Sequence, residues 1–147
     1  MQLSLFSDYS MRMLLFLAVC QDQRATIRQI ASAYGVSRPH LMKVANELAR
    51  QGYLETTRGR AGGLKLAMPP EKINVGKVLK ESEKHIPLVQ CFDAARNTCV
   101  LSPGCHLKAI LGEAENRFYD SLSSYTLADL VRTRAARGAI EQAASGV

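Results

Sequence analysis

The sequence predicts a mainly α-helical protein with one small β-hairpin, arranged as a winged helix-turn-helix domain followed by a long helix. Three observations support this fold class. Apolar residues recur at helical spacing in several segments, two of these segments are separated by only a tight turn, and a basic glycine-rich loop lies between two strand-like runs. At 147 residues, the chain can bury one core and have an appended element.

The first helix is expected from Leu5 to about Cys20, where apolar residues follow three-and-four spacing. Ser7 or Asp8 is the expected N-cap. The apolar run is too short to span a bilayer, and neither a basic leader nor a small-residue cleavage site accompanies it. We therefore expect a soluble cytoplasmic protein with no membrane partner. Because Cys20 lies in this apolar helix, we expect it to be an ordinary core residue.

Two short helices joined by a tight turn are expected next. The segment TIRQIASAYG has Thr26 as its capping residue and ends at Gly35. The segment SRPHLMKVANELARQG has Ser37 as its N-cap and ends just before Gly52. Two helices in this arrangement favour a helix-turn-helix, whose second helix enters a major groove of DNA.

A β-hairpin is expected in YLETTRGRAGGLKLAMPP. Its strands run from Tyr53 to Thr57 and from Leu64 to Ala67, with RGRAGG as the connecting loop and two prolines at the end. A hairpin directly after a helix-turn-helix is typical of a wing, which lies along the adjoining DNA backbone or minor groove.

The remainder of the chain predicts a short helix in INVGKVLKESE and a long helix after the cysteines. Apolar residues keep helical spacing from Leu107 to Tyr125, and a stripe of that length needs a partner. A second copy of the chain would give a two-fold dimer. We therefore divide the chain into a DNA-binding domain (1–85), a cysteine loop (86–106), a dimerisation helix (107–132) and a flexible tail (133–147).

The formal net charge of +6 is concentrated in the first half of the chain. Residues 1–70 have nine Lys and Arg against four acidic residues, whereas residues 71–130 have seven against eight. Uneven basic charge of this kind favours a polyanionic partner, here double-stranded DNA. The expected contacts are basic residues of the second helix of the pair and of the wing: Arg38, His40, Lys43, Arg58 and Arg60.

Three of the four cysteines, Cys91, Cys99 and Cys105, lie within the fifteen residues CFDAARNTCVLSPGC. In a reducing compartment such a group indicates metal or redox chemistry rather than disulfides. Three thiolates on one loop can converge on a metal centre, and soft sulfur selects iron–sulfur clusters, zinc or copper. Zinc is disfavoured because a close Cys-x-x-Cys pair is missing. A fourth ligand would come from elsewhere.

The chain resembles the NsrR/IscR family of winged-helix transcription regulators along almost its whole length. Three features support the resemblance: the opening set Phe6, Asp8, Tyr9 and Arg12, the wing RGRAGGLKLA, and the three-cysteine loop before a long helix. Within the family, the segments CFDAARNTC, LSPGCHLKAIL and SYTLADLV are most similar to the NsrR branch, whose members are nitric-oxide-sensing repressors.

The resemblance implies a homodimer in which Cys91, Cys99 and Cys105 hold an iron–sulfur cluster, with [4Fe–4S] as the expected type and [2Fe–2S] as the alternative. It also implies that Asp8 of the other subunit completes the site, a role that competes with helix capping. Members similar to IscR have a histidine three residues after the last cysteine. Lys108 stands at that position here, which counts against a regulator of cluster biogenesis.

The expected function is that of a homodimeric repressor, not an enzyme, that releases a palindromic operator when nitric oxide attacks the cluster. The wide spacing of the first two cysteines is also found in RirA-like regulators, so a response to iron or cluster supply (RirA-like or IscR-like) is an alternative. A metal-free thiol switch is a second alternative. A small electron-transfer protein would leave the winged helix without a purpose.

Overall fold

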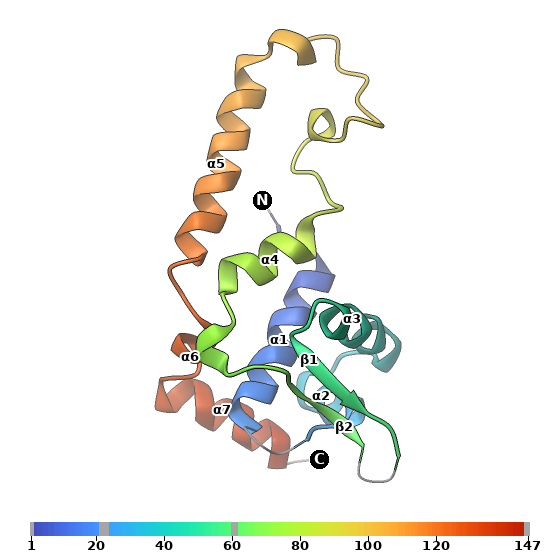
Figure 1. Cartoon of the computed structure of the whole chain (residues 1–147), viewed down its shortest axis with the longest axis vertical. Helices are drawn as coiled ribbons and strands as arrows, with labels where there is room; N and C mark the ends of the chain where they lie inside the picture. Colours follow the sequence, from blue (N-terminus) through green and yellow to red (C-terminus); the bar gives the residue numbers. More distant parts are fainter. Residues whose placement is uncertain (1, 21–23, 60–61, 146–147) are drawn as a thin grey trace.

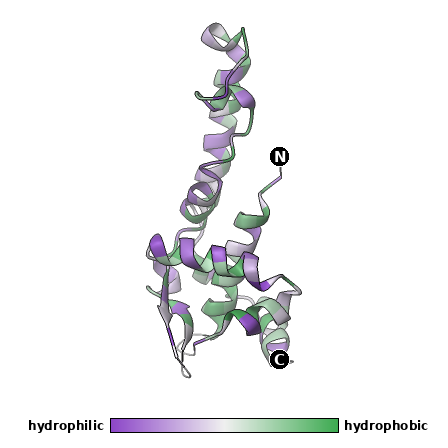
Figure 2. Cartoon of the chain, turned by 90° about the vertical axis from the view of Figure 1, so that its right-hand side faces the viewer, coloured by the Kyte–Doolittle hydropathy of each residue, from purple (hydrophilic) through white to green (hydrophobic). Residues whose placement is uncertain are grey.

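The computed structural model describes residues 2–20, 24–59 and 62–145 of the chain. Figure 1 shows a compact body, which contains both strands and most helices, and one long helix, α5 (His106–Leu122), that extends away from it. The cysteine segment, residues 84–105, connects the body to the far end of α5. In the side view of Figure 2, α5 has hydrophilic and hydrophobic residues along its length. No helix in the described ranges is long and apolar enough to cross a membrane.

Helix α1 (Leu5–Cys20) forms the centre of the body. Its buried apolar side chains are Met13, Leu14, Phe16, Leu17 and Ala18. The helix has the predicted bounds, but its cap lies earlier than predicted, because Ser4 Oγ accepts a hydrogen bond from the Ser7 amide at 3.1 Å. Capping by Ser7 or Asp8 is therefore wrong: Ser7 is fully buried and Asp8 lies inside the first turn.

Helices α2 (Ile27–Tyr34) and α3 (Arg38–Arg50) form the predicted helix-turn-helix. Thr26 starts α2 with a reciprocal capping box, and Gly35 ends it in the left-handed conformation with φ 63°. Ser37 occupies the N-cap position of α3, although its side chain makes no capping hydrogen bond. The apolar face of α3 packs against α1 through Leu41, Val44, Ala45 and Leu48.

Strands β1 (Leu54–Thr57) and β2 (Gly63–Leu66) pair antiparallel, with Leu54 opposite Leu66, and form the predicted wing. Ala25 exchanges two backbone hydrogen bonds with β2, at 2.7 and 2.9 Å, which fix the base of the wing beside the start of α2. The predicted fold class, a mainly helical chain with one small hairpin, is confirmed.

Helix α4 (Val75–Glu83) joins the body to the base of α5. Asn74 caps α4, because its Oδ1 accepts a hydrogen bond from the Lys77 amide at 2.9 Å. Its side-chain amide donates a second hydrogen bond to the Ser123 carbonyl at 2.7 Å. Gly76 lies against the last turn of α5, where a Cβ atom would overlap with Ser123 Oγ and with the Tyr119 carbonyl. The two helices are therefore in direct backbone contact.

The long helix is shorter than the sequence predicted. It ends at Leu122, and a separate short helix, α6 (Leu127–Leu130), follows. Thr126 starts α6 with a capping box, and the first amide of α6 donates to the Ile73 carbonyl at 2.8 Å. Because these bonds turn the chain back to the body, the helix expected over residues 107–132 is interrupted.

A helix also replaces the expected flexible tail. Residues Arg134–Ser145 form α7, which packs against α2 and α1, and its Ile140 and Ala144 contact the core. Arg137 Nε donates a hydrogen bond to the Val131 carbonyl at 3.1 Å and so holds the first half of α7 to the end of α6. Docking onto the core supplies the stability that a short Ala-rich helix lacks by itself.

Candidate nucleic-acid interface and cysteine segment

The outer face of α3 is the candidate DNA-contacting surface. The side chains exposed on it are those of Arg38, Pro39, His40, Met42, Lys43 and Asn46. Arg38 and Lys43, which the sequence predicted as contacts, form no ion pair within the described part of the chain. Their charges are therefore available to phosphate groups.

The C-terminal half of α3 is closer to neutral than its first half. Arg50 donates to both carboxylate oxygens of Glu47, at 2.6 and 2.9 Å. These hydrogen bonds lower the pKa of the Glu47 carboxyl and keep it ionised. Unpaired positive charge on α3 thus lies near the helix start, the end that contacts DNA in helix-turn-helix proteins.

His40 lies where α3 meets α1. It is exposed, and the centroid of its ring is 6.2 Å from that of Tyr9. Tyr9 directly follows Asp8 in α1. His40, a predicted DNA contact, therefore lies beside Tyr9, and Tyr9 is next in sequence to Asp8, the predicted cluster ligand.

The wing provides the second group of predicted contacts. Arg58 directly follows β1 and is exposed, and Gly59 has φ 103°, a conformation that favours glycine and turns the chain at the tip. Arg60, which was also predicted to contact DNA, lies outside the described residues. Exposed basic residues are therefore present on both α3 and the wing.

The three clustered cysteines lie in the cysteine segment at the far end of the molecule from the wing. Cys91 is half-buried in a short 3₁₀ helix, Cys99 is exposed, and Cys105 is half-buried immediately before α5. All are free thiols. Among the described residues, no three Cys, His, Asp or Glu side chains converge on one point.

The hydrogen bonds that hold the cysteine segment are local. Gln90 donates to the Arg96 carbonyl and to Thr98, and Asn97 donates to Ser102 and accepts from the Cys99 amide. None of these bonds involves a thiol, and none of the three cysteines belongs to the hydrophobic core. Three accessible thiols are a donor set that fits an iron–sulfur cluster.

Asp8 has a partner within the chain. Its carboxylate accepts from Arg12 Nη2 at 2.9 Å and from Arg12 Nε at 3.0 Å, and both side chains are about two-fifths exposed. The Arg12 guanidinium also lies over the ring of Tyr34, 5.8 Å from its centroid. Asp8 therefore lies on the surface of the body and needs to leave Arg12 before it can bind a metal.

Glu83 is a residue that the sequence analysis missed. It ends α4 where the cysteine segment begins, is 9% exposed, and accepts hydrogen bonds from the Ser4 amide at 2.7 Å and from the Ser7 hydroxyl. The bonds connect the first turn of α1 with the root of the cysteine segment. No sequence pattern indicated them, because the partners are 79 and 76 residues apart.

Replacing Glu83 with alanine is expected to lower the free energy of unfolding by about 2 kcal/mol, because the buried Ser7 hydroxyl and the partly buried Ser4 amide lose their acceptor. Glu83→Gln keeps an acceptor oxygen and is expected to cost less than half as much. Urea unfolding of the reduced, metal-free protein measures both values. Equal losses in the two variants would show that these hydrogen bonds do not stabilise the junction.

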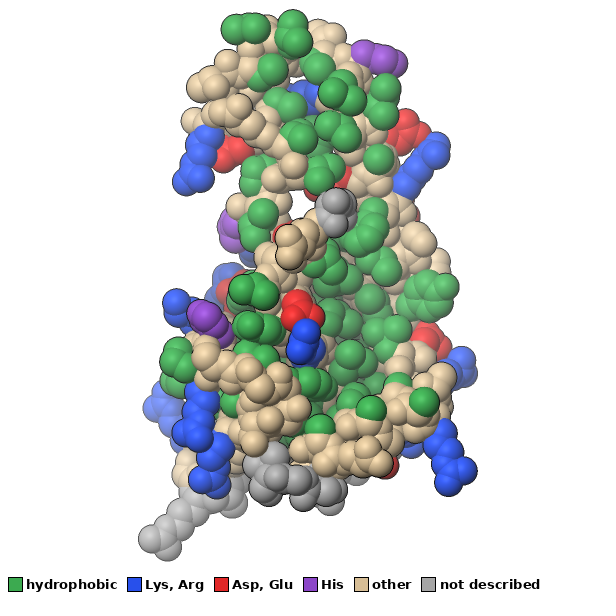
Figure 3. Space-filling model, turned by 180° about the vertical axis from the view of Figure 1, so that it is seen from behind, with side chains coloured by type: hydrophobic (Ala, Val, Ile, Leu, Met, Phe, Trp, Pro, Cys, Tyr) green, Lys and Arg blue, Asp and Glu red, His purple; other side chains and the backbone are tan. Residues whose placement is uncertain are grey.

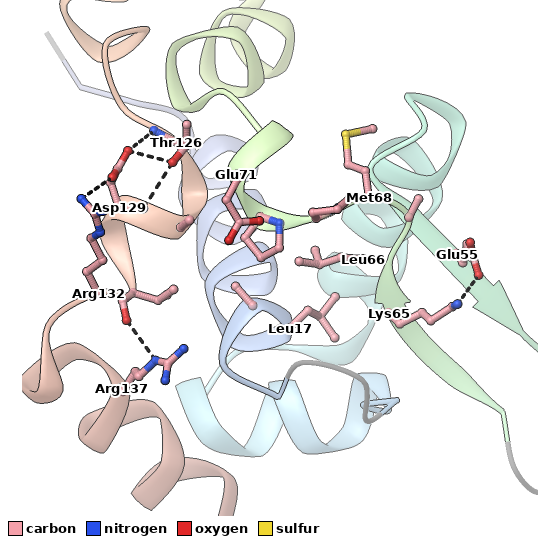
Figure 4. Close-up of a pocket in the computed structure, with 16 residues that line it drawn as sticks. Leu17, Glu55, Lys65, Leu66, Met68, Glu71, Thr126, Asp129, Arg132 and Arg137 are labelled. Atoms are coloured by element: carbon pink, nitrogen blue, oxygen red, sulfur yellow. Dashed lines mark hydrogen bonds and ion pairs between the residues drawn. The ribbon is translucent and has the colours of Figure 1, made fainter.

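A cleft of about 720 Å³ lies between the wing and α6–α7, and none of the cysteines of the cysteine segment lines it. Figure 4 shows Leu66 and Met68 on one side of it and Asp129, Arg132 and Arg137 on the other. Its charged groups bond mainly to one another: Asp129 pairs with Arg132 at 3.2 Å, and the wing residues Lys65 and Glu55 pair at 2.8 Å. Most of the charged groups in this cleft are therefore already paired within the chain.

A helix-turn-helix with an exposed basic face, followed by a basic hairpin, defines a winged-helix DNA-binding protein. The model of the Rrf2 family, described as an iron-dependent transcriptional regulator, matches residues 3–133. The chain belongs to the Rrf2 family and is a DNA-binding transcription regulator, not an enzyme.

Relatives of similar length support this assignment. The HTH-type transcriptional regulator NsrR of Bacillus subtilis strain 168 is 47% identical over 135 residues, which cover 91% of this chain and 92% of the relative. NsrR of Geobacillus kaustophilus strain HTA426 is 46% identical, with 92% of each chain covered. The predicted similarity to the NsrR branch is confirmed.

Solved structures support the fold. The oxidised form of CymR from Staphylococcus aureus matches with a TM-score of 0.69 and 22% identity, over 90% of this chain and 98% of that one. IscR of T. potens matches with a TM-score of 0.66 and 21% identity, over 90% and 87% of the two chains. At these identities, the matches concern the fold alone.

Proposed function

We propose that the chain is a homodimeric cytoplasmic repressor that senses nitric oxide through an iron–sulfur cluster and binds a palindromic operator. Cys91, Cys99 and Cys105 hold the cluster, of the [4Fe–4S] type, and Asp8 of the partner subunit completes it. The observation that supports this most strongly is the set of three free thiols with no internal partner, in a chain about 45% identical to regulators named NsrR.

Exposed apolar residues support the dimer. Leu107 and Ile110 on α5 are 61% and 48% exposed, and Val100 and Leu101 in the cysteine segment are 91% and 68% exposed. Figure 3 shows hydrophobic side chains gathered on one face from the upper end of the molecule down to the body. A contiguous patch of this kind in a chain of this family is suited to a two-fold contact between copies.

The switch requires residues that adopt two arrangements. When bound, the cluster supplies iron that reacts with nitric oxide. In the proposed repressing form, Asp8 leaves Arg12 and reaches the partner's cysteines; after ligation is lost, the Asp8–Arg12 pair of the described structure forms again. Because Tyr9 contacts His40, this exchange changes the environment of α3. Only a difference in DNA affinity between the two arrangements can regulate transcription.

The DNA contacts proposed are Arg38, His40, Lys43, Arg58 and Arg60. The first three lie on α3, where Arg38 and Lys43 have no acidic partner among the described residues, and Arg58 projects from the wing. In a dimer the two α3 helices read half-sites one helical turn, or a multiple of it, apart. The operator is accordingly expected to be palindromic.

Anaerobic native mass spectrometry of the full-length protein, with operator binding followed on the same samples during nitric oxide titration, tests the proposal. A dimer with four irons and four sulfides per chain, which releases DNA as nitric oxide is added, would support it. The variant Asp8→Ala is expected to lose iron faster on dilution than the wild type.

Other outcomes would favour the alternative signals. A cluster that does not react with nitric oxide, in a protein that loses both the cluster and DNA binding on iron chelation, would indicate an iron-responsive regulator. A metal-free dimer with full operator affinity would leave only the thiol switch. Unchanged iron retention in Asp8→Ala would contradict the role of Asp8 while leaving the cysteine site intact.

A further inference from the structure

Two exposed residues of α3, one apolar and one polar, lie side by side on the helix. Leu41, Val44, Ala45 and Leu48 face the core, and because one turn of an α-helix has 3.6 residues, Asn46 lies on the opposite side and Met42 on the flank of that side. Met42 and Asn46 are four residues apart and therefore neighbours on this face. Neither is basic, and neither was singled out from the sequence.

Met42 is exposed where the fold gives no reason for an apolar side chain. It is 56% exposed. The other exposed large apolar side chains of the described structure lie at the start of α1, in the cysteine segment, on α5 or just after it: Leu5, Ile86, Val100, Leu101, Leu107, Ile110 and Tyr125. Among the described residues of the helix-turn-helix and the wing, Met42 is therefore the one large apolar residue that is exposed.

Asn46 has unused hydrogen-bonding capacity. It is exposed, and its side-chain amide has no partner among the residues that the structure describes. The neighbouring polar groups bond to one another instead: Arg50 and Gln51 both donate to Glu47, at 2.6 and 2.8 Å. The carbonyl oxygen and the amide group of Asn46 are thus exposed and free to bond to an external partner.

These two side chains match one kind of base pair. In the major groove, an asparagine amide can bond to both N6 and N7 of adenine, and apolar side chains contact the C5 methyl group of thymine. Basic residues on the same face, Arg38 and Lys43, suit phosphates, which hold the helix in place without reading sequence. The free face of α3 therefore offers two contacts suited to A·T pairs.

We propose that Met42 and Asn46 determine operator specificity, Met42 by contact with a thymine methyl group and Asn46 by a bidentate hydrogen bond to an adenine. The inference rests on the proposed function, in which α3 enters the major groove. Four residues span about 6 Å along a helix, and base pairs are about 3.4 Å apart. The two contacted base pairs are accordingly expected within about two steps of each other.

The test begins with the full-length, anaerobically purified protein, from which an operator is selected out of random duplex DNA. Each thymine of the half-site is then replaced, symmetrically in both half-sites, by uracil, which lacks only the methyl group. Each adenine is replaced by 7-deazaadenine, which lacks the N7 acceptor. Dissociation constants are measured for the wild type, Met42→Ala and Asn46→Ala at one fixed salt concentration.

One thymine is expected at which uracil weakens wild-type binding about fivefold or more and does not weaken Met42→Ala further. One adenine, within two base pairs, is expected to show the same loss with 7-deazaadenine for the wild type and none for Asn46→Ala. Both variants are expected to melt within about 2 °C of the wild type, because exposed positions contribute little to stability.

Lys43→Ala is the matched control, since it lies on the same face. It is expected to weaken binding to every sequence alike, to reduce the salt dependence by about one counterion, and to keep the full penalty for uracil. If Met42→Ala and Asn46→Ala lose the same factor on modified and unmodified operators, the assignment is wrong. If the wild type selects no sequence at all, the proposed function fails with it, so the two failures are distinguishable.

Discussion

The variant Cys99→Ala is expected to purify without its iron–sulfur cluster while keeping the fold of the wild type. Changing groups that merely support a metal ligand already costs about 10- to 100-fold in metal affinity. Loss of a ligand itself is expected to cost more than about 100-fold. The fold is expected to persist, because the Cys99 side chain is exposed and its amide still donates to Asn97.

Cys20→Ala is the matched control for this prediction. Cys20 ends α1, is half-buried and packs against the core, and burial raises the pKa of its thiol. A thiol with a raised pKa is protonated near neutral pH and is a poor metal ligand. This variant is therefore expected to bind as much iron and sulfide as the wild type.

Iron and acid-labile sulfide per chain, measured under anaerobic conditions, and the thermal melting of the metal-free forms check both expectations. Operator affinity is expected to fall in Cys99→Ala and to be unaffected by nitric oxide. A normal cluster in Cys99→Ala would contradict the three-cysteine site. Loss of the cluster in Cys20→Ala would show that the cluster also depends on a cysteine outside the cysteine segment.

Local signals in the sequence were sufficient to predict the DNA-binding half of the fold. The limits of α2 follow from two features that act within a few residues, the capping box at Thr26 and the left-handed Gly35. The wing follows from two short strand-like runs on either side of a glycine-rich loop. Each of these features is decided by neighbours in the chain, so no knowledge of the tertiary structure was needed.

The features that the sequence did not predict depend on distant contacts. Helix α7 is held by the core and by the Val131 carbonyl, and the end of α5 is set by hydrogen bonds with residues near Ile73. Apolar residues can keep helical spacing beyond the end of a helix, so spacing alone does not show where contacts with another segment end it. For the same reason, the buried role of Glu83 was not visible.

The candidate site divides in the same way. Basic residues at the start of α3 could be predicted, because the position of a recognition helix determines which residues face DNA. The cysteines could be identified by type, but they do not converge on one point within the described residues, and their role as cluster ligands stays a prediction. Met42 was not singled out, since apolar spacing identifies the core-facing residues of α3 without showing which of its other side chains are exposed.

Gly76→Ala is expected to lower the free energy of unfolding by about 3 kcal/mol. The new Cβ atom would overlap with Ser123 Oγ and the Tyr119 carbonyl, and would lie 2.6 Å from the Ser123 amide nitrogen. Two of these three atoms are backbone atoms, one in the last turn of α5 and one in the residue that follows it, so the clash cannot be relieved by a side-chain rotation. The gain in helix propensity, at most about 1 kcal/mol, does not offset it.

Gly138→Ala provides the comparison, because Gly138 lies inside α7 and a Cβ atom there would meet nothing within 4 Å. It is expected to be neutral or slightly stabilising. Urea unfolding of the reduced, metal-free proteins gives both values. The α4–α5 contact also sets the direction in which α5 leaves the body, so Gly76→Ala is expected to weaken binding to a two-half-site operator more than binding to non-specific DNA. Equal losses on both would show that this contact supports stability alone and does not set the spacing of the two α3 helices.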